Sequence, residues 1–318
     1  MKNIYGEKYS GDSKFVAKCR QLQSIYRVEI GEEIRPYIDR NGKIHYYGNY
    51  ISNGENPKES CWKNFLTECA FEYAKYRVEH KEKYETIESD RLFNNLLSSQ
   101  PMAFNLFCPL RNMSSEIATK VIKAALPDYP IYKVTKIELE FIPEKHMELT
   151  GDKSAMDAII EFEDEDGKEG FIAVETKYSE NLGTNAAYVK DENGKKMPRL
   201  QSINAIKELQ CFNPITEKGI MEGKIPLTQI YRNFLLSEMY GYKEGLKSYS
   251  IILAPKEHPS TKREVNSLCD KLRDECKSKI KIVHLEDFVE KIIDSCPEEY
   301  RGDFEKFKDR YLNWSKVE

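Results

Sequence analysis

Two acidic side chains and a lysine lie at the ends of two short apolar runs. Asp157 comes just before the run Ala-Ile-Ile at 158–160, and Glu175 and Lys177 follow the run Phe-Ile-Ala-Val at 171–174. Charged side chains are rarely fully buried unless they are paired or bind a metal ion. Their place beside apolar strands therefore indicates that they share a site.

The residues between these charges predict an antiparallel hairpin. Asp166-Gly167 is a turn dipeptide, and apolar residues flank it on both sides. A turn centred on Asp166 places Asp157 opposite Glu175, whereas a turn centred half a residue earlier places it opposite Val174. Because a slip of one residue reverses the faces of one strand, only the first register, or a bulge that restores it, brings the two carboxylates together.

Paired carboxylates of this kind are suited to bind a divalent metal ion. In the first register, the Cβ atoms of Asp157 and Glu175 lie about 5 Å apart. Two carboxylates at that separation repel each other, and a cation removes the repulsion. Mg²⁺ is commonly held by one or two carboxylates together with water and substrate phosphates. Lys177 shares a strand face with Glu175, so it could hold or activate a water molecule near the ion.

An aspartate followed by Glu175-Thr176-Lys177 after a hairpin, with a helix before the first strand, resembles the PD-(D/E)XK nuclease superfamily, which includes many type II restriction endonucleases. The resemblance covers roughly residues 114 to 285. It implies catalysis by Asp157, Glu175 and Lys177, and binding of Mg²⁺, for which Mn²⁺ can substitute, by Asp157, Glu175 and Thr176. It also implies hydrolysis of phosphodiester bonds in nucleic acid, with DNA as the expected substrate. Met156 stands where many members have a proline.

The resemblance also implies a glutamate on the helix before the first strand. Glu116 is the first choice for this catalytic role, because it lies near the start of the helical segment 114–127. Glu68 and Glu72 are rivals on an earlier helix. A glutamate in a first turn can equally be there only to interact with the helix dipole.

Five polar residues are candidates for substrate binding: Gln201, Gln229 and Arg232 on the helices after the Glu-x-Lys strand, and Ser99 and Gln100 just before Pro101. Arg232 could contact a phosphate or pair with Glu238. The Ser-Ser-Gln stretch could line the cleft or simply cap a helix. A loop near the site carries three more cations, which could meet a phosphate backbone or remain solvated: Lys195, Lys196 and Arg199.

The pattern of apolar residues predicts the elements that position these groups. Helical spacing indicates a helix from Trp62, two short helices broken at Pro101, and helices within 114–127, 198–212, 225–244, 261–279 and 286–294. Strand patterns occupy 132–144, 155–164, 170–178, 248–255 and 280–285. This order predicts an α/β fold, a restriction-endonuclease-like core with a mixed central sheet flanked by helices. We expect residues 101–318 to form that domain, and residues 1–100 to add a mainly helical elaboration that does not fold independently.

The overall composition limits where the protein acts and how it binds. With a formal net charge of −4, the 318-residue chain has no global attraction for nucleic acid, so binding needs local patches or the composite cleft of a homodimer. No apolar run is long enough for a membrane span and the first residues are polar, which makes the cytoplasm the expected location. The eight cysteines form no Cys-x-x-Cys pair and are expected to be free thiols.

Two alternatives to a DNA nuclease stay open at the level of sequence. The fold could be a module that binds nucleic acid or protein with weak or no catalysis, since similar folds host unrelated functions. The chain could also be a nuclease that acts on RNA or on branched structures. Metal binding by Asp157 and Glu175 separates the first alternative from an enzyme, because a binding module has no need of it.

Overall fold

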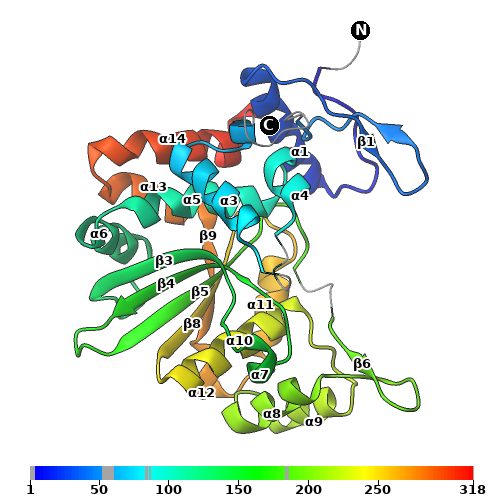
Figure 1. Ribbon diagram of the computed structural model, residues 1–318, viewed down its shortest axis with the longest axis vertical. Helices are drawn as coiled ribbons and strands as arrows, with labels where there is room; N and C mark the ends of the chain where they lie inside the picture. The colour runs from blue at the N-terminus through cyan, green and yellow to red at the C-terminus, as the bar shows by residue number, and fades with distance from the viewer. Residues whose placement is uncertain (1–3, 52–60, 83–84, 86, 183–185, 318) are drawn as a thin grey trace.

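A mixed five-stranded sheet forms the centre of the molecule, with helices on both faces (Figure 1). The computed structural model describes residues 4–51, 61–82, 85, 87–182 and 186–317. The sheet contains, in chain order, β3 (Lys133–Phe141), β4 (Met156–Glu163), β5 (Glu169–Thr176), β8 (Lys247–Ala254) and β9 (Ile280–His284). The strands are neighbours in that same order, antiparallel from β3 to β5 and parallel from β5 to β9. The predicted α/β fold with a mixed sheet is confirmed.

Two groups of helices cover the sheet. The side that contains both chain ends carries α1 (Lys14–Glu29), α3 (Glu68–Glu79), α4 (Ser89–Asn94), α5 (Ser99–Asn112), α6 (Ser115–Ala125), α13 (Leu285–Ser295) and α14 (Glu298–Leu312). The other side carries α7 (His146–Leu149), α8 (Leu200–Leu209), α9 (Pro214–Met221), α10 (Gln229–Glu244), α11 (Thr261–Cys269) and α12 (Asp274–Lys277).

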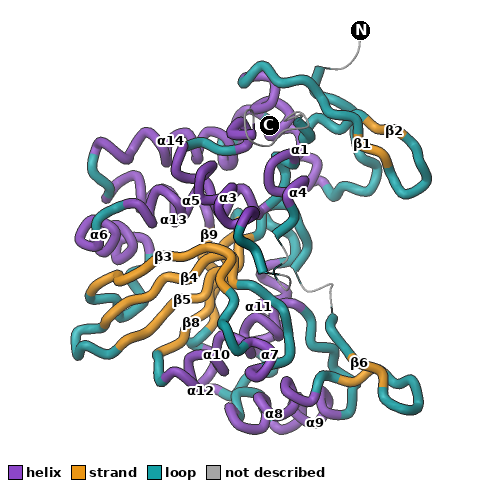
Figure 2. The backbone as a smooth tube through the Cα atoms, in the orientation of Figure 1, coloured by secondary structure: helices purple, strands orange, loops and turns teal. Residues whose placement is uncertain are grey.

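Short elements complete the described chain. Two hairpins project from the body, one made of β1 (Tyr37–Ile38) and β2 (Ile44–His45), the other of β6 (Val189–Lys190) and β7 (Lys196–Met197) (Figure 2). Two 3₁₀ turns are η1 (Cys61–Asn64) and η2 (Trp314–Lys316). The segment 52–60 of the turn-rich N-terminal region lies outside the described residues.

Strand alternation divides the buried side chains into two cores. Ile160 and Val174 point into the core beneath α5, α6 and α13, whereas their neighbours Ile159 and Ala173 point into the core beneath α10 and α11. Successive side chains of a strand point to opposite faces of a sheet. Because both faces are covered, the middle of β4 and of β5 is apolar, at Ala158–Ile160 and Phe171–Val174, and the acidic residues Asp157 and Glu175 beside these runs stand out.

The helix boundaries differ from the predicted ones at two places near the N-terminus. The helix predicted from Trp62 begins instead at Glu68, because the side chain of Thr67 caps it by accepting from Ala70 N. Pro101 was predicted to break a helix, yet it lies in the first turn of α5. A first-turn proline removes an N–H that has no partner within the helix, so it does not interrupt the helix.

A third difference lies near the C-terminal end of the sheet. The single helix predicted within 261–279 is two helices, α11 and α12. Between them, Leu272 forms a backbone bridge to Phe212, and Asn213 N donates to Lys271 O. These contacts draw the chain out of the helical path.

Two expectations about the chain as a whole can be compared with the structure. None of the described helices combines the length and the apolar character that crossing a membrane requires. The seven cysteines whose side chains are described are free thiols, as predicted, and most of them are buried.

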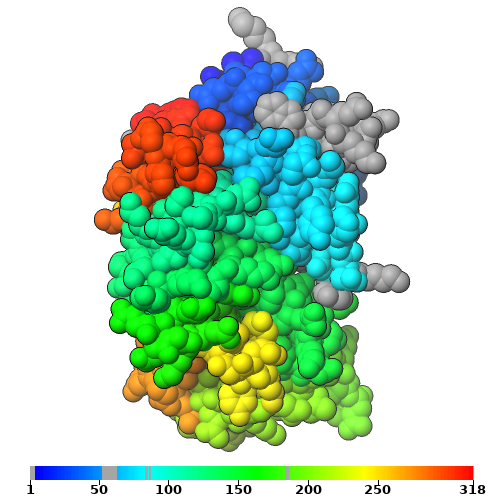
Figure 3. Space-filling view, turned by 60° about the vertical axis from the view of Figure 1, so that its left-hand side comes forward, coloured from blue at the N-terminus to red at the C-terminus, as the bar shows by residue number. Residues whose placement is uncertain are grey.

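The N-terminal and C-terminal segments are joined by the buried guanidinium of Arg310 on α14. It donates to Gln23 Oε1 of α1 at 3.1 Å and to the carbonyl and side-chain oxygens of Asn64 in η1 at 2.8 and 2.5 Å. It also stacks over the ring of Tyr26, 4.2 Å from its centre. Figure 3 shows the N-terminal segment, in blue, beside the red C-terminal helix. The elaboration and the α/β part thus meet through a buried polar network.

This network generates the first prediction. An Arg310→Leu substitution should lower the free energy of unfolding by about 3 kcal/mol or more, because it leaves three buried acceptors without a donor. Arg301→Leu on the exposed side of the same helix should change it by less than about 0.5 kcal/mol. Urea denaturation followed by circular dichroism measures both. A single transition that shifts as a whole agrees with a dependent N-terminal region, whereas two separate transitions would contradict it.

Candidate active site

The beginning of β4 and the ends of β3 and β5 border a polar pocket of about 540 Å³. Residues from several separate parts of the chain line it: Glu88, Arg91, Ser99, Gln100, Glu140, Asp152, Lys153, Ser154, Ala155, Asp157, Glu175, Lys177, Ala187, Arg199, Gln229 and Arg232. All three residues of the predicted motif are among them. Of the predicted substrate-binding residues, only Gln201 is absent from the lining, and its side chain is exposed.

The hairpin has the register that brings the two carboxylates together. Ala158 pairs with Val174, and Ile160 pairs with Ile172. One further step along the same register sets Asp157 opposite Glu175. The alternative register, with Asp157 opposite Val174, is excluded by this pairing.

Asp157 is fixed by the chain that follows Glu175. Its Oδ2 atom accepts from the backbone N–H of Thr176 at 2.6 Å and from the Thr176 hydroxyl at 2.7 Å. Both bonds use the same oxygen, so Oδ1 remains available on the side of the pocket. Burial raises the pKa of Asp157, while the charge of Lys177 and the two bonds from Thr176 oppose that rise.

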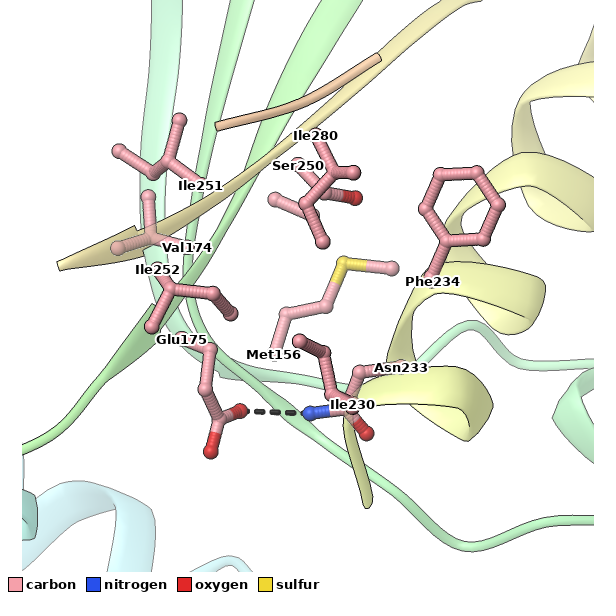
Figure 4. Close-up of a pocket in the computed structure, with 11 residues that line it drawn as sticks. Met156, Val174, Glu175, Ile230, Asn233, Phe234, Ser250, Ile251, Ile252 and Ile280 are labelled. Carbon is pink, nitrogen blue, oxygen red and sulfur yellow. Dashed lines mark hydrogen bonds between the residues drawn. The ribbon is translucent and has the colours of Figure 1, made fainter. Parts of the chain in front are cut away.

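Glu175 is buried and surrounded by donors. Its Oε1 atom lies 2.6 Å from the Lys177 ammonium and accepts from Gln229 Nε2 at 2.9 Å. Its Oε2 atom accepts from Asn233 Nδ2 at 2.6 Å, as Figure 4 shows. Burial and the charge of Asp157 nevertheless raise the pKa of Glu175 to about 7. Burial would lower the pKa of Lys177, but the charges of Glu175 and Asp157 outweigh it and raise that pKa.

An apolar cavity of about 20 Å³ lies behind Glu175 (Figure 4). Met156, Ile230 and Phe234 are among its lining residues. Met156, which replaces the proline common at this position in the superfamily, therefore has a packing role here. Glu175 lines both this apolar cavity and the polar pocket, so its carboxylate lies at the boundary between them.

Glu140 is an acidic residue of the site that sequence analysis missed. It is only 4% exposed, and Gln100 Nε2 donates to its Oε1 at 2.9 Å. Its backbone is in the left-handed region with φ of 52°, which is uncommon for a residue other than glycine. Arg77 binds the carbonyls of Leu139 and Glu140 at 2.7 and 2.9 Å and thereby holds this conformation. Burial and the charge of Asp157 raise the pKa of Glu140 to about 8.

A fixed cation stands at another side of the pocket. Arg91 of α4 donates to Glu180 Oε1 at 2.6 Å and to Ser98 Oγ at 2.8 Å, and Glu180 also accepts from Ser99 N at 2.8 Å. Burial alone would raise the pKa of Glu180, but the charges of Arg91 and Lys177 lower it to about 2. Glu180 is thus a stable counter-ion that holds Arg91 at the pocket.

The Ser-Ser-Gln stretch fulfils both of the roles considered for it. Ser98 caps α5 by accepting from Gln100 N at 3.2 Å. Ser99 and Gln100 line the pocket, where they bind Glu180 and Glu140. The N-terminus of α5 therefore organises two carboxylates of the site.

The cations beyond the Glu-x-Lys strand divide into two groups. Arg232 lines the pocket and pairs with Asp152 at 2.8 Å. The predicted pairing of Arg232 with an acidic neighbour is therefore confirmed, but the neighbour is not Glu238, which bonds to Ser248 and Lys279 instead. Arg199 also lines the pocket, but Lys195 and Lys196 do not. Of these three cations, only Arg199 therefore lies in the same pocket as Asp157, Glu175 and Lys177.

Glu116 is not brought to the pocket. It is exposed in the first turn of α6, and the neighbouring residue Ser115 bonds to the carbonyl of Val134 near the start of β3. Glu140 lies near the opposite end of β3. The rivals Glu68 and Glu72 are exposed on α3 and do not line the pocket either. A helix residue that does line the pocket is Gln100 of α5, which donates to Glu140.

The residues present suit a hard divalent cation chemically. Carboxylate and carbonyl oxygens are the ligands that Mg²⁺ and Mn²⁺ prefer, and the unfavourable ionisation of Asp157, Glu175 and Glu140 is the state that a cation would relieve. As the side chains stand, no three acidic, histidine or cysteine groups of the described chain converge on one point. The Glu175 carboxylate already accepts from Lys177, Gln229 and Asn233. Binding of a metal ion by Glu175 therefore requires it to give up part of these contacts.

Comparison with known proteins agrees with this geometry. A family model described as the PD-(D/E)XK nuclease superfamily matches residues 10–313. No curated protein and no solved structure matches the chain. Since the matched segment covers nearly the whole chain and the central sheet has the expected mixed arrangement, the chain belongs to the PD-(D/E)XK nuclease superfamily.

Proposed function

We propose that this protein is a Mg²⁺-dependent phosphodiesterase, a DNA endonuclease whose catalytic residues are Asp157, Glu175 and Lys177. The observation that carries the proposal is the buried Lys177–Glu175 pair, 2.6 Å apart, in a pocket that Asp157 also lines. A binding module would gain little from this arrangement. Burying an ion pair beside a further carboxylate costs desolvation energy, and titratable groups perturbed in this way cluster at functional sites.

Asp157, Glu175 and the carbonyl of Thr176 would hold the metal ion, with Mn²⁺ able to replace Mg²⁺. We add Glu140 as the third carboxylate, in place of Glu116. A divalent ion bound there supplies positive charge for the phosphate oxygens and lowers the pKa of bound water. Gln229 and Asn233 keep the Glu175 carboxylate oriented, because each donates to a different oxygen of it.

The other residues of the pocket would act on the water and the phosphate. Lys177 would position the attacking water for in-line displacement at phosphorus. Arg91, Arg232 and Arg199 line the same pocket, and their guanidinium groups match the geometry of phosphate oxygens. These arginines would form a local, arginine-lined border for the phosphate backbone, which the net charge of −4 does not exclude. A homodimer would extend that border.

Two other functions remain as measurable alternatives. One is a nuclease that prefers RNA or branched nucleic acid, since the same three residues would serve any phosphodiester. The other is a catalytically weak module that binds nucleic acid or protein, in which Asp157 and Glu175 take no metal. Mn²⁺ titration separates an enzyme from a non-catalytic module, and cleavage of DNA, branched DNA and RNA separates the two kinds of nuclease.

Metal binding is the first test. Calorimetric titration of Mn²⁺ into the purified protein should show binding that disappears in the Asp157→Ala, Glu175→Ala double variant. The matched control is Asp166→Ala, Glu169→Ala, which removes two exposed carboxylates of the same hairpin and should bind as the wild type does. If the wild type and the Asp157→Ala, Glu175→Ala variant both fail to bind Mn²⁺, even with DNA present to supply phosphate oxygens, the non-catalytic module is favoured.

Lys177→Ala should reduce cleavage by about 10²-fold or more, because a positioned group that handles the attacking water contributes 10²- to 10⁴-fold to a reaction. The variant should still fold and bind DNA, although its thermal unfolding midpoint should fall, because Glu175 loses its buried cationic partner. The assay compares Mg²⁺-dependent cleavage of plasmid DNA, duplex oligonucleotides, branched DNA and RNA. Lys168→Ala, an exposed lysine of the same hairpin, is the control. A Lys177→Ala protein that cleaves at the full rate would refute the role.

Glu140 and Glu116 can be compared directly. Glu140→Gln keeps an oxygen that can accept from Gln100 but removes the charge, so it should weaken Mn²⁺ binding and cleavage, whereas Glu116→Gln should change neither. The folded-state pKa of Glu140 is raised to about 8 from an ordinary value near 4.3. Its ionisation therefore costs stability as pH rises from 4.3 to 8. Without metal, Glu140→Gln should unfold at a higher temperature than the wild type above pH 8, and equal affinity for Mn²⁺ would exclude Glu140 as a ligand.

A further inference from the structure

A second pocket lies in the N-terminal region, outside the catalytic pocket. It encloses about 530 Å³, which is within the usual range for ligand sites. Five of its eleven lining residues carry aromatic rings, namely Tyr9, Tyr37, His45, Tyr47 and Tyr50, and the others are polar or charged. Neither the motif nor the proposed reaction uses any of these side chains.

The rings hold one another in place. Tyr37 stacks on Tyr50 with ring centres 5.3 Å apart, and His45 stacks on Tyr47 at 5.0 Å with only 9° between the planes. Tyr9 meets Tyr47 edge-on at 5.6 Å. Adjacent rings at these separations attract each other beyond their burial of apolar area. The walls are thus built before any ligand arrives.

Two of the rings remain open to solvent although they line a concave site. Tyr9 is 48% exposed and Tyr37 is 37% exposed, while Tyr47 behind them is buried. Clustered exposed aromatic side chains commonly mark a binding site. Stacking surfaces on a preformed wall favour a flat, unsaturated ligand.

Polar groups at the border of this pocket can form hydrogen bonds with the edge of such a ligand. The His45 ring lies 3.3 Å from Asp39 Oδ2 and 3.6 Å from Glu7 Oε2. Asp39 is itself oriented, because its Oδ1 atom accepts from the N–H of Lys43 at 2.9 Å. The side chains of Lys8 and Lys43 line the pocket too, and within the described residues their ammonium groups form no ion pair.

The charges argue against a cationic ligand and against an apolar one. Arg20 already lies against the rings of Tyr9 and Tyr47, at 5.6 and 5.3 Å from their centres, where a bound cation would stack. Asp12 and Asn49 hold it there. Lys8, Lys43 and Arg20 outnumber the two acidic lining residues, Glu7 and Asp39, which disfavours a cation, and the charged border does not suit an apolar side chain.

The short helix α4 connects this pocket to the catalytic one. Tyr50, a wall of the aromatic pocket, forms a backbone bridge to Asn95 at the end of α4. Arg35 stacks over Tyr50 and pairs with Asp90 of α4 at 2.5 Å. The next residue, Arg91, lines the catalytic pocket. Figures 1 and 2 show α4 between the projecting β1–β2 hairpin and the sheet.

We propose that the aromatic pocket binds an unpaired nucleobase of DNA or RNA, with the adjoining phosphates held by Lys8 and Lys43. A base presents two flat faces to Tyr37 and Tyr9 and a polar edge to Asp39 and His45. The inference rests on the proposed function in one respect, namely that the protein binds nucleic acid. It adds that the protein engages an unstacked or single-stranded nucleotide at a place separate from the cleavage site.

Binding of single strands without metal tests this directly. Fluorescence anisotropy in EDTA would use labelled oligothymidylate and oligouridylate of about ten nucleotides and a blunt hairpin duplex of similar length. We expect tighter binding of at least one single strand than of the duplex. Tyr37→Ala and, separately, Tyr9→Ala should weaken single-strand binding by about ten-fold, since each removes a stacking surface. The two oligonucleotides show whether the base comes from DNA or RNA.

Two controls make the outcome decisive. Tyr37→Phe keeps the ring and should retain the affinity, and Tyr242→Ala removes an exposed tyrosine of α10 outside the pocket and should also retain it. The assay is done in EDTA and does not depend on turnover, so a failure of the proposed cleavage would leave this result intact. Unchanged affinity in both folded variants, Tyr37→Ala and Tyr9→Ala, would overturn the inference even if the protein cleaves DNA.

Discussion

Repulsion among buried carboxylates is the constraint on which the rest of the site depends. Asp157, Glu175 and Glu140 line one pocket, and burial together with their mutual repulsion raises the pKa of each. The fold offsets this with fixed donors: the N–H and hydroxyl of Thr176, the ammonium of Lys177, and amides from α10 and α5. Such donors do not fully compensate for the lost hydration of the carboxylates. The site therefore lowers the free energy of unfolding, and a bound cation would raise it again.

The same constraint explains the unusual backbone at the end of β3. The backbone of Glu140 takes a left-handed conformation beside the pocket, which costs roughly 1 kcal/mol or more for a residue with a side chain. Arg77 compensates by binding two successive carbonyls there and pairing with Glu85 at 3.0 Å. A strained residue that brings a further negative charge to a negative site has no stabilising purpose, which favours a functional one.

What the sequence could reveal follows from which signals are local. The hairpin and its register are local, since Asp166-Gly167 and the apolar runs determine where Asp157 meets Glu175. Glu140 was not accessible in this way, because Glu138 and Glu140 alternate with apolar neighbours as solvent-facing residues of a strand do. Only tertiary contacts with Gln100 and Arg77 turn it inward. Glu116 misled for the converse reason: a glutamate in a first turn has a sufficient local explanation in the helix dipole.

The N-terminal region shows the same limit on a larger scale. Its residues have weak periodicity, and its structure depends on distant partners such as Arg310, which binds Gln23 and Asn64. Because these contacts and the Arg35–Asp90 pair tie the region to the elements that carry Arg91, the aromatic pocket and the catalytic pocket form parts of one packed body. A nucleotide held at one of them would therefore lie at a set spacing from the other. The element between the two pockets is α4. Its first turn is held by the Arg35–Asp90 pair and its end by the backbone bridge between Tyr50 and Asn95, so a change at the aromatic pocket could reach Arg91 in the catalytic pocket through this helix.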